Sequence, residues 1–305
     1  MSQAGSNGSG GGGGGNYISL SPYIVGPDIH SGYATIGAAI SAAVGAGASS
    51  TSPANIYVKP QSGGYTENLV VSDGINLIGF NQATFINGKI SMATAGTATV
   101  SGLTLKTNGD YVVQLTGANV TNVNLFNCFL LGSDANLINI TGANCVLNAI
   151  RTDGDCTTNT YFIATAGAIN GNYCNFLSLT NTSTQSTIAN CDLSLLYSSC
   201  EAPILTTGTA SISLDYSRMF NSSSIPLIHN GTGDSFGLHS RFETDTASAV
   251  SIGVGSTLTL LNSAINSHNV NAITGAGTLL YSFLSFYGTS SGVNVATATP
   301  YPTLI

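Results

Sequence analysis

The chain has 305 residues, of which 43% are hydrophobic and only 6% are charged, far below the charged fraction of an ordinary soluble domain. Its net charge of −7 excludes the basic surface that nucleic acids and anionic lipids require. No apolar run is long enough to cross a bilayer, and the first residues lack the basic and apolar regions of a cleavable signal peptide. We therefore expect a large apolar interior under an amide- and hydroxyl-rich surface, with no nucleic-acid binding and no membrane insertion.

Residues 1–31 are rich in glycine, and we interpret them as an N-terminal arm. The arm contains the unbroken run Gly10, Gly11, Gly12, Gly13, Gly14 and Gly15. Such a run is flexible in isolation, so we expect it to be an assembly arm that contacts a neighbouring subunit. The run is not a phosphate-binding loop, because no Lys-Ser/Thr pair and no strand-to-helix context follow it.

Residues 32–53 predict a capping helix followed by a linker. Between Tyr33 and Val44, apolar residues recur at helical spacing on one face: Ile36, Ala39, Ile40, Ala43 and Val44. After this segment the pattern changes to short β-branched runs such as Ile56-Tyr57-Val58. The sequence predicts no second helix.

Residues 54–298 repeat with a period of about 22 to 25 residues, which is typical of solenoid proteins. Apolar strand centres recur at Val113, Ile138, Ile163, Leu179, Ile204, Ile228, Val250, Ile273 and Val295. A second series consists of glycines from Gly96 to Gly277, with Ser186 in place of one of them. The signature of leucine-rich repeats is missing, so we predict an all-β parallel β-helix of about ten coils, with a C-terminal tail at residues 299–305.

A third series places one small residue in each coil: Cys128, Ala149, Cys174, Cys191, Ser217, Ser240, Ser263 and Ser285. Small residues that recur in this way are typical of a buried tight bend, so we expect the three cysteines in the series to be core residues without disulfides. Cys145, Cys156 and Cys200 lie outside the series. The sequence leaves the burial of these three open.

Four stretches within residues 32–80 resemble the opening of pectin-lyase-like right-handed β-helix proteins, including pectin methylesterases. The stretches are Gly32–Ala43 (GYATIGAAISAA), Asn55–Pro60 (NIYVKP), Gly64–Leu69 (GYTENL) and Ile75–Gly79 (INLIG). The resemblance implies a right-handed solenoid whose first coil is covered by Ile36, Ile40 and Val44. The Asn-x-Asp, Asp-Asp, Gly-His-Gly and Arg-x-Lys motifs of polygalacturonases are missing, as is the paired-Asp site of pectin methylesterases. The resemblance therefore implies the fold without the enzymatic activity.

Asp192, Arg218 and Arg241 each follow the small-residue series by one position, which predicts that they stack outward on successive coils. One interpretation is a binding site for an anionic glycan, because an arginine fork matches carboxylate geometry. The other is that these residues form surface contacts, an ion pair of Asp192 with Arg218 and a contact of Arg241 with Glu243 or with solvent, which would contribute little to stability. We favour the surface contacts.

Two further groups of residues are candidates for a binding site, one for calcium and one for sugar. Asp153 and Asp155 have the spacing of a calcium loop but lack its other ligands, so we predict a tight turn and no metal or other cofactor. Trp is absent, and five phenylalanines inside apolar runs are expected to be core residues rather than sugar-binding rings: Phe129, Phe162, Phe176, Phe242 and Phe283.

These observations predict a non-enzymatic structural protein that assembles with copies of itself. We expect a virion appendage, such as a tail fibre or spike, or an extracellular filament. The alternative is a β-helix protein that binds or degrades polysaccharide, with surface glycans as partners. An open solenoid end exposes unpaired strand edges, so the coil at Val293-Asn294-Val295 is the expected contact, and Pro300-Tyr301-Pro302 is expected to stop further strand pairing.

Overall fold

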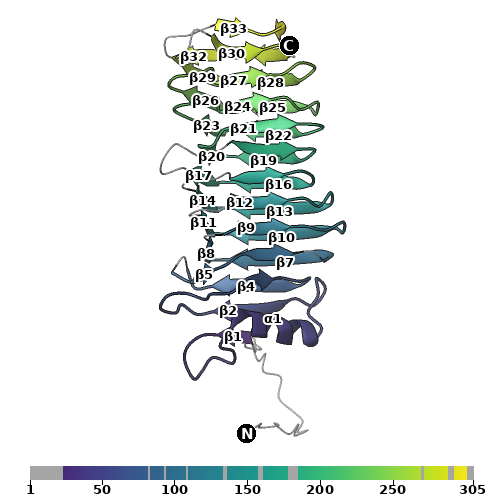
Figure 1. The fold of residues 1–305 in the computed structure, drawn as a ribbon, viewed down its shortest axis with the longest axis vertical. Helices are drawn as coiled ribbons and strands as arrows, with labels where there is room; N and C mark the ends of the chain where they lie inside the picture. Colours follow the sequence, from purple (N-terminus) through teal and green to yellow (C-terminus); the bar gives the residue numbers. More distant parts are fainter. Residues whose placement is uncertain are drawn as a thin grey trace, which may run out of the picture.

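The computed structural model describes residues 23–300, except residues 82, 93, 108, 133–135, 157–160, 178–184, 269–270 and 288–291. The described chain winds into an elongated parallel β-helix whose coils stack from the N-terminal to the C-terminal end (Figure 1). Three sheets run along it, with thirteen, ten and eleven strands in the described chain. We call them the first, second and third sheet, in the order in which the chain visits them from β4 onward. The predicted all-β parallel β-helix of about ten coils is confirmed.

The first sheet contains β1 (Tyr23–Val25), β2 (Ala54–Val58), β4 (Ile75–Gly79), β7 (Gly96–Ser101), β10 (Thr121–Phe126), β13 (Cys145–Ile150), β16 (Ala168–Asn172), β19 (Asp192–Leu196), β22 (Ser211–Asp215), β25 (Ser235–Leu238), β28 (Thr257–Leu261), β31 (Thr278–Ser282) and β34 (Thr297–Pro300). The second sheet contains β5 (Phe85–Asn87), β8 (Thr104–Thr107), β11 (Phe129–Gly132), β14 (Asp153–Cys156), β17 (Asn175–Leu177), β20 (Ser199–Cys200), β23 (Arg218–Phe220), β26 (Arg241–Thr244), β29 (Ala264–Ser267) and β32 (Ser285–Tyr287). The third sheet contains β3 (Leu69–Val70), β6 (Ile90–Met92), β9 (Tyr111–Leu115), β12 (Asn136–Ile140), β15 (Phe162–Ala164), β18 (Ser186–Ala189), β21 (Ile204–Thr207), β24 (Leu227–His229), β27 (Val250–Ile252), β30 (Asn271–Gly275) and β33 (Gly292–Asn294).

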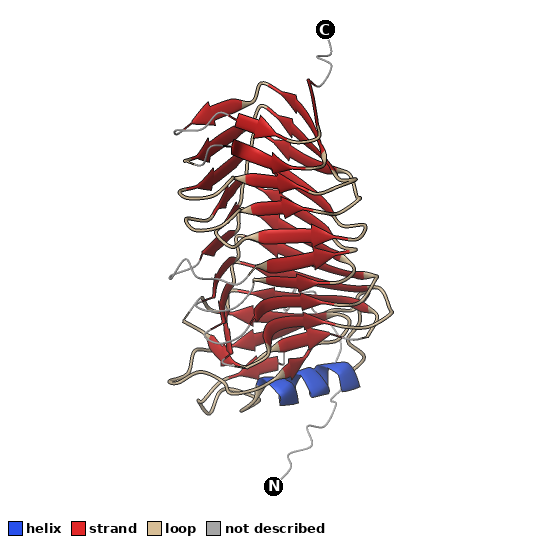
Figure 2. Ribbon diagram, turned by 45° about the horizontal axis from the view of Figure 1, so that its top comes forward, coloured by secondary structure: helices blue, strands red, loops and turns tan. Residues whose placement is uncertain are grey.

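The helix α1 (Ile36–Gly45) lies across the N-terminal end of the solenoid, as predicted (Figure 2). Its buried face consists of Ile36, Ala39, Ile40 and Ala43. Val44 was expected to cover the first coil but is 44% exposed, because it lies at the edge of the apolar face. Among the described residues, no helix has the length and hydropathy needed to span a membrane.

The interior is made of columns that receive one side chain from each coil. In the third sheet the register places these residues in one column: Val113, Ile138, Phe162, Ser186, Ile204, Leu227, Val250, Ile273 and Val293. The predicted strand centres Ile163 and Ile228 are therefore wrong by one residue, and Val295 by two; Leu179 lies outside the described residues. Coil lengths vary, and an error of one residue changes the face of the strand.

The solenoid extends beyond the limits expected from the sequence. Strand β1 lies in the segment assigned to the arm and pairs in parallel with β2, with Tyr23 opposite Ile56. Strand β34 reaches Pro300, within the segment assigned to the tail. The glycine run at residues 10–15, like Tyr301 and Pro302, lies outside the described residues.

Candidate functional site

The chain passes from the first sheet to the second through a corner of two residues that repeats along the rod. The first corner residue has a left-handed backbone, with φ between 47° and 54°. These residues are Asn127, Arg151, Tyr173, Tyr197, Tyr216, His239, Asn262 and Phe283. A left-handed φ costs an L-residue roughly 1–2 kcal/mol, and Asn tolerates it better than an aromatic residue does. The aromatic residues at these corners therefore need a compensating interaction.

The second corner residue is small in the coils from Cys128 to Ser263, whereas Leu103 and Leu284 occupy this position in the coils before and after them. Ser198 and Ser217 show why. The Ser198 hydroxyl accepts a hydrogen bond from the backbone N–H of Cys174 (3.1 Å), and the Ser217 hydroxyl accepts one from the N–H of Ser198 (3.2 Å). Each hydroxyl thus satisfies a buried donor of the preceding coil, which would otherwise be costly.

This inner corner column corrects the predicted small-residue series. Ala149 lies within β13, Cys191 directly precedes β19, and Ser285 lies one residue past its corner. Thr152 and Ser198 occupy corner positions in place of Ala149 and Cys191. The prediction failed because the coils differ in length, so a fixed spacing drifts from the corner into a neighbouring strand.

Four outer corner side chains on consecutive coils form a stack that we call the aromatic ridge: Tyr173, Tyr197, Tyr216 and His239. Neighbouring ring centroids are 5.1, 5.0 and 4.4 Å apart, with interplanar angles of 11°, 17° and 13°. These distances follow the spacing of adjacent strands, about 4.8 Å. Each stacked pair contributes roughly 0.5–1.5 kcal/mol, which offsets the backbone cost. The tyrosines remain about half exposed, so the ridge is a surface feature.

Beside the ridge, the outer face of the first sheet holds a shallow, open groove of about 400 Å³. Asn124, Asn148 and Asn170 line it, one from each of three successive coils. The side-chain amide of Asn148 donates to the Asn124 oxygen (2.9 Å), and that of Asn170 donates to the Asn148 oxygen (2.8 Å). Ile150 and Leu196 add apolar surface at the edge nearest the ridge.

On the second sheet, two arginines share one carboxylate. Arg218 and Arg241 occupy equivalent positions in β23 and β26, and both guanidinium groups contact the carboxylate of Glu243. Glu243 is buried, and the Arg218 guanidinium also lies 4.9 Å from the ring centre of Phe220. Because Glu243 already binds both forks, the arginines are held by the protein itself.

Asp192 does not belong to this cluster. It lies in β19 of the first sheet, where it accepts a hydrogen bond from the Ser211 hydroxyl. The residue of the preceding coil that pairs with Arg218 is Ser199. The expected stack of Asp192 with the two arginines, and the expected Asp192–Arg218 ion pair, are therefore wrong, whereas the Arg241–Glu243 contact is present. The anionic-glycan interpretation loses its geometric basis.

The other predicted site residues are parts of strands. Asp153 and Asp155 lie in β14, so the predicted turn is wrong. The Asp153 carboxylate accepts from the backbone N–H and the side-chain amide of Asn175, both at 3.1 Å. Within the described ranges, no group of three or more His, Cys, Asp or Glu side chains is arranged to hold a metal ion.

All six cysteines are buried, and none of them forms a disulfide. Burial raises the pKa of Cys128 to about 11 and those of Cys191 and Cys200 to about 12. These thiols therefore stay protonated at neutral pH and are poor nucleophiles. The burial of Cys145 and Cys156, which the sequence left open, is also settled as core packing.

Five phenylalanines were expected to be core residues, and three of them are fully buried. Phe162, Phe176 and Phe242 are fully buried, and Phe129 is half-buried. Phe283 is 72% exposed, because it occupies an outer corner position. The aromatic ridge was not predicted from the sequence, because apolar and aromatic runs were assigned to the core and no tyrosine was expected to be an exposed ring.

No protein-family profile matches the sequence, and no curated protein matches it either. Among solved structures, the chain is similar to the A-module of mannuronan C-5 epimerase AlgE6 from Azotobacter vinelandii, with a TM-score of 0.46 and 11% identity over 88% of this chain and 94% of that chain. It is also similar to a pectin methylesterase from Aspergillus niger, with a TM-score of 0.28 and 17% identity over 89% of this chain and 86% of that chain. The β-helix expected from the resemblance in residues 32–80 is the fold that the described residues adopt.

Proposed function

We propose that the protein is a structural rod that assembles with further copies of itself through its C-terminal end. The supporting observation is that the interior columns open at this end of the described chain. Ile273 is fully buried, but Val293, its partner in the next coil, is 37% exposed. Likewise Leu279 is buried, whereas its partner Ala298 is exposed. Apolar interior that ends in this way is stabilised when another surface covers it.

The last strand of each sheet also leaves an edge unpaired in the described chain: β32, β33 and β34. Unpaired N–H and C=O groups are a template for another strand. Pro300 removes one donor from β34, which disfavours pairing there. Strands β32 and β33 contain no proline. We therefore place the contact on the second and third sheets.

The occupant in this proposal is the N-terminal arm of the next copy. The arm precedes β1, at the opposite end of the rod, so contacts of this kind are head-to-tail and extend into a filament. Between the glycine run at residues 10–15 and β1, the segment 18–21 (ISLS) alternates apolar and polar residues, the pattern of a strand that adds to a sheet edge.

The proposal assigns the rod no catalytic role. Three of its carboxylates are engaged in structural contacts: Glu243 with two arginines, Glu67 with backbone N–H groups of α1, and Asp73 with the N–H groups of Ser50 and Thr97. A stiff solenoid with few charges suits a component of a virion appendage, such as a tail fibre or spike, or of an extracellular filament.

Light scattering and negative-stain microscopy on the full chain test this proposal. We expect fibres or defined oligomers that are lost in a chain lacking residues 1–21 and in Val293→Lys, because the truncation removes the added strand and a charge at the edge opposes strand addition. The matched control is Val254→Lys, which places the same charge on an exposed turn and should leave assembly intact. A monodisperse monomer of the full chain would contradict the proposal.

A further inference from the structure

We propose that the groove on the outer face of the first sheet, beside the aromatic ridge, binds a neutral oligosaccharide. The site is separate from the Arg218–Glu243 cluster and from the C-terminal end, so it does not depend on the proposed assembly. Its lining comes from β10, β13, β16 and β19, four successive coils. A volume of about 400 Å³ lies within the usual range of small-molecule sites.

The amide column supplies directional hydrogen bonds along the groove. Each carboxamide has two N–H donors and two oxygen lone pairs, and each bond within the column uses one donor and one lone pair. Asn148, in the middle of the column, therefore keeps a donor and a lone pair for a ligand, and Asn170 is exposed. Ser194 continues the column on β19 with a hydroxyl. The amides repeat at the strand spacing of about 4.8 Å, similar to the advance of one residue in an extended pyranose chain.

Besides the amide column, the groove contains one polar atom that lacks a partner. It is the side-chain oxygen of the half-buried Asn172, which is shielded from solvent and has no hydrogen bond in the described part of the chain. An unsatisfied buried acceptor costs roughly 1–3 kcal/mol. A sugar hydroxyl, met by rotation of the amide about its terminal torsion, would supply the missing donor.

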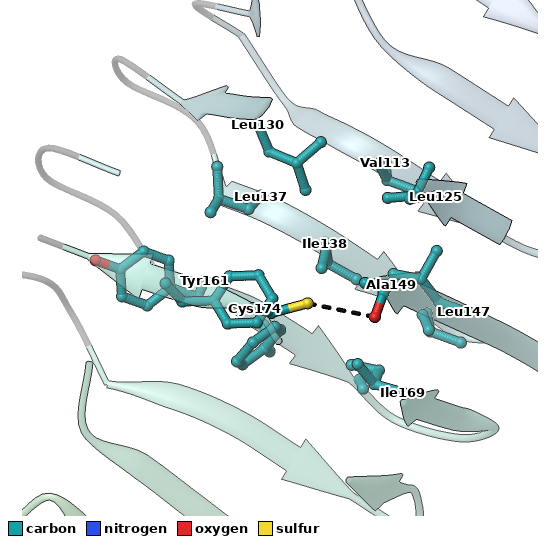
Figure 3. Close-up of a cluster of buried hydrophobic side chains, with 14 of the residues drawn as sticks. Val113, Leu125, Leu130, Leu137, Ile138, Leu147, Ala149, Tyr161, Ile169 and Cys174 are labelled. Carbon is teal, nitrogen blue, oxygen red and sulfur yellow. Dashed lines mark hydrogen bonds between the residues drawn. The ribbon is translucent and has the colours of Figure 1, made fainter. Parts of the chain in front are cut away.

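The inner side chains beneath the floor of the groove include two small residues. In the inner column under the groove, the register runs Leu125, Ala149, Gly171, Leu195 along successive coils, so the two smallest residues lie between two leucines. The corner thiol of Cys174 donates to the carbonyl oxygen of Ala149 (3.3 Å) and packs into this space (Figure 3). The hollow on the outer face lies over these small residues.

The side of the groove nearest the corner combines apolar and polar groups. Ile150 and Leu196 are half-buried and offer apolar contact to the C–H faces of a pyranose ring. Tyr173 and Tyr197 follow the lining residues Asn172 and Leu196. Their ring faces are stacked on each other, so they offer ring edges and phenol hydroxyls to a ligand. None of the described residues that line the groove is charged, which favours a neutral chain over an anionic one.

Isothermal titration calorimetry of the full chain with defined hexasaccharides tests this site. The neutral probes are cellohexaose, chitohexaose, xylohexaose and mannohexaose, and the anionic probe is hexagalacturonate. We expect at least one neutral hexasaccharide to bind with a Kd below about 1 mM, and hexagalacturonate to bind more weakly. Failure of all four neutral probes, or tighter binding of hexagalacturonate, would overturn the proposal.

Two variants locate the binding. Ser194→Tyr fills the groove and should weaken the binding of the neutral probe at least tenfold. Its matched control is Ser213→Tyr, at the equivalent position of the next coil, which does not line the groove and should leave the Kd unchanged. Asn170→Ala removes an exposed amide and should weaken binding about threefold even if Ser194→Tyr fails to fold. Equal affinity of the wild-type chain and either groove variant would place the ligand elsewhere and refute this site.

Discussion

The two ends of the rod terminate the same interior in different ways. At the N-terminal end, α1 lies across the first coils (Figure 2). It buries Ile36 and Ile40, and the Glu67 carboxylate accepts hydrogen bonds from the first N–H groups of the helix. At the C-terminal end the described chain has only strands, with Val293 partly exposed and β34 exposed throughout. Both ends have the same kind of interior side-chain column, so they differ in whether another element covers the last side chains of that column. The interior at the N-terminal end is already covered by α1, whereas the partly exposed Val293 at the C-terminal end of the described chain is suited to contact another surface.

The largest effect should come from breaking the N-terminal cover. Ile36→Asp places an unpaired charge at a fully buried position, and we expect it to lower the free energy of unfolding by more than about 4 kcal/mol. Val44→Asp puts the same charge on the exposed side of the same helix and should change it by less than about 1 kcal/mol. Urea unfolding followed by circular dichroism compares the two. Similar losses in both variants would mean that α1 does not close the end.

A second pair of variants compares equivalent core positions near the two ends. Leu77 lies between β2 and β7, whereas Leu279 is followed only by Ala298 of β34. Both leucines are fully buried. We expect Leu77→Ala to cost roughly 2–5 kcal/mol and Leu279→Ala clearly less, because a cavity next to the open end can collapse or fill with water.

The leucine comparison also reports on assembly. In a chain lacking residues 1–21, which we expect to be monomeric, the difference between Leu77→Ala and Leu279→Ala should be largest. In the proposed assembly of the full chain a neighbour would cover the C-terminal end, so the two losses should converge. Urea midpoints of the four proteins measure this, and a difference that is the same in both backgrounds would argue against a covered C-terminal end.

The capping helix and the repeat could be predicted from the sequence because both are local patterns. Helical spacing of Ile36 and Ile40 identifies a helix without knowledge of its partners, and β-branched runs between glycines identify strands. The period of about 22 to 25 residues then implies a solenoid. Each of these signals survives small errors in register, which is why the fold was correct although several column assignments were not.

The outer neighbours of Asp192, Arg218 and Arg241 and the stacking of the aromatic ridge could not be predicted, because both depend on the strand register over many coils. Coils of different length moved Ala149 out of the corner column, and the same drift placed Asp192 beside arginines that it does not meet. The ridge had a usable signal in the pairs Tyr173-Cys174 and Tyr197-Ser198, an aromatic residue directly before a small one. The rule that apolar rings lie in the core concealed it, since a left-handed corner directs the ring outward.

A smaller effect should follow from loosening the cover without removing it. Glu67 accepts bonds from the backbone N–H groups of Ile36 (2.9 Å) and Gly37 (2.8 Å), and its charge also favours the helix N-terminus. We expect Glu67→Ala to cost roughly 1–2 kcal/mol and Glu67→Gln about half of that, because the amide oxygen still accepts. Hydrogen exchange of the α1 amides, with β31 as an internal reference, measures this. Unchanged protection of α1 in Glu67→Ala would show that the carboxylate does not hold the helix.

The smallest effect should be a difference in the acid sensitivity of the two halves. Hydrogen bonds from the backbone N–H groups of Thr97 and Ser50 lower the pKa of Asp73, near the N-terminal end, from its usual 3.8. Burial lowers the pKa of His229, in the C-terminal half, from 6.5; its ring is held by Thr206 (2.8 Å) and by the carbonyl oxygen of Thr257 (3.2 Å). In both cases the unfolded chain binds more protons than the folded chain below the usual pKa, so stability falls as the pH falls.

The two windows begin at different pH, about 6.5 for His229 and about 3.8 for Asp73, and this separates the ends. Below pH 6.5 the neutral His229 destabilises the C-terminal half, while the contribution of Asp73 persists until the pH falls below 3.8. We expect segment-resolved hydrogen exchange, corrected for intrinsic rates, to show weaker protection of β21, β24 and β27 at about pH 5.5 than at about pH 7.5, with α1 and β2 unchanged. His229→Gln should remove this pH dependence, because an amide does not titrate. Persistence of the effect in His229→Gln would assign it to other groups.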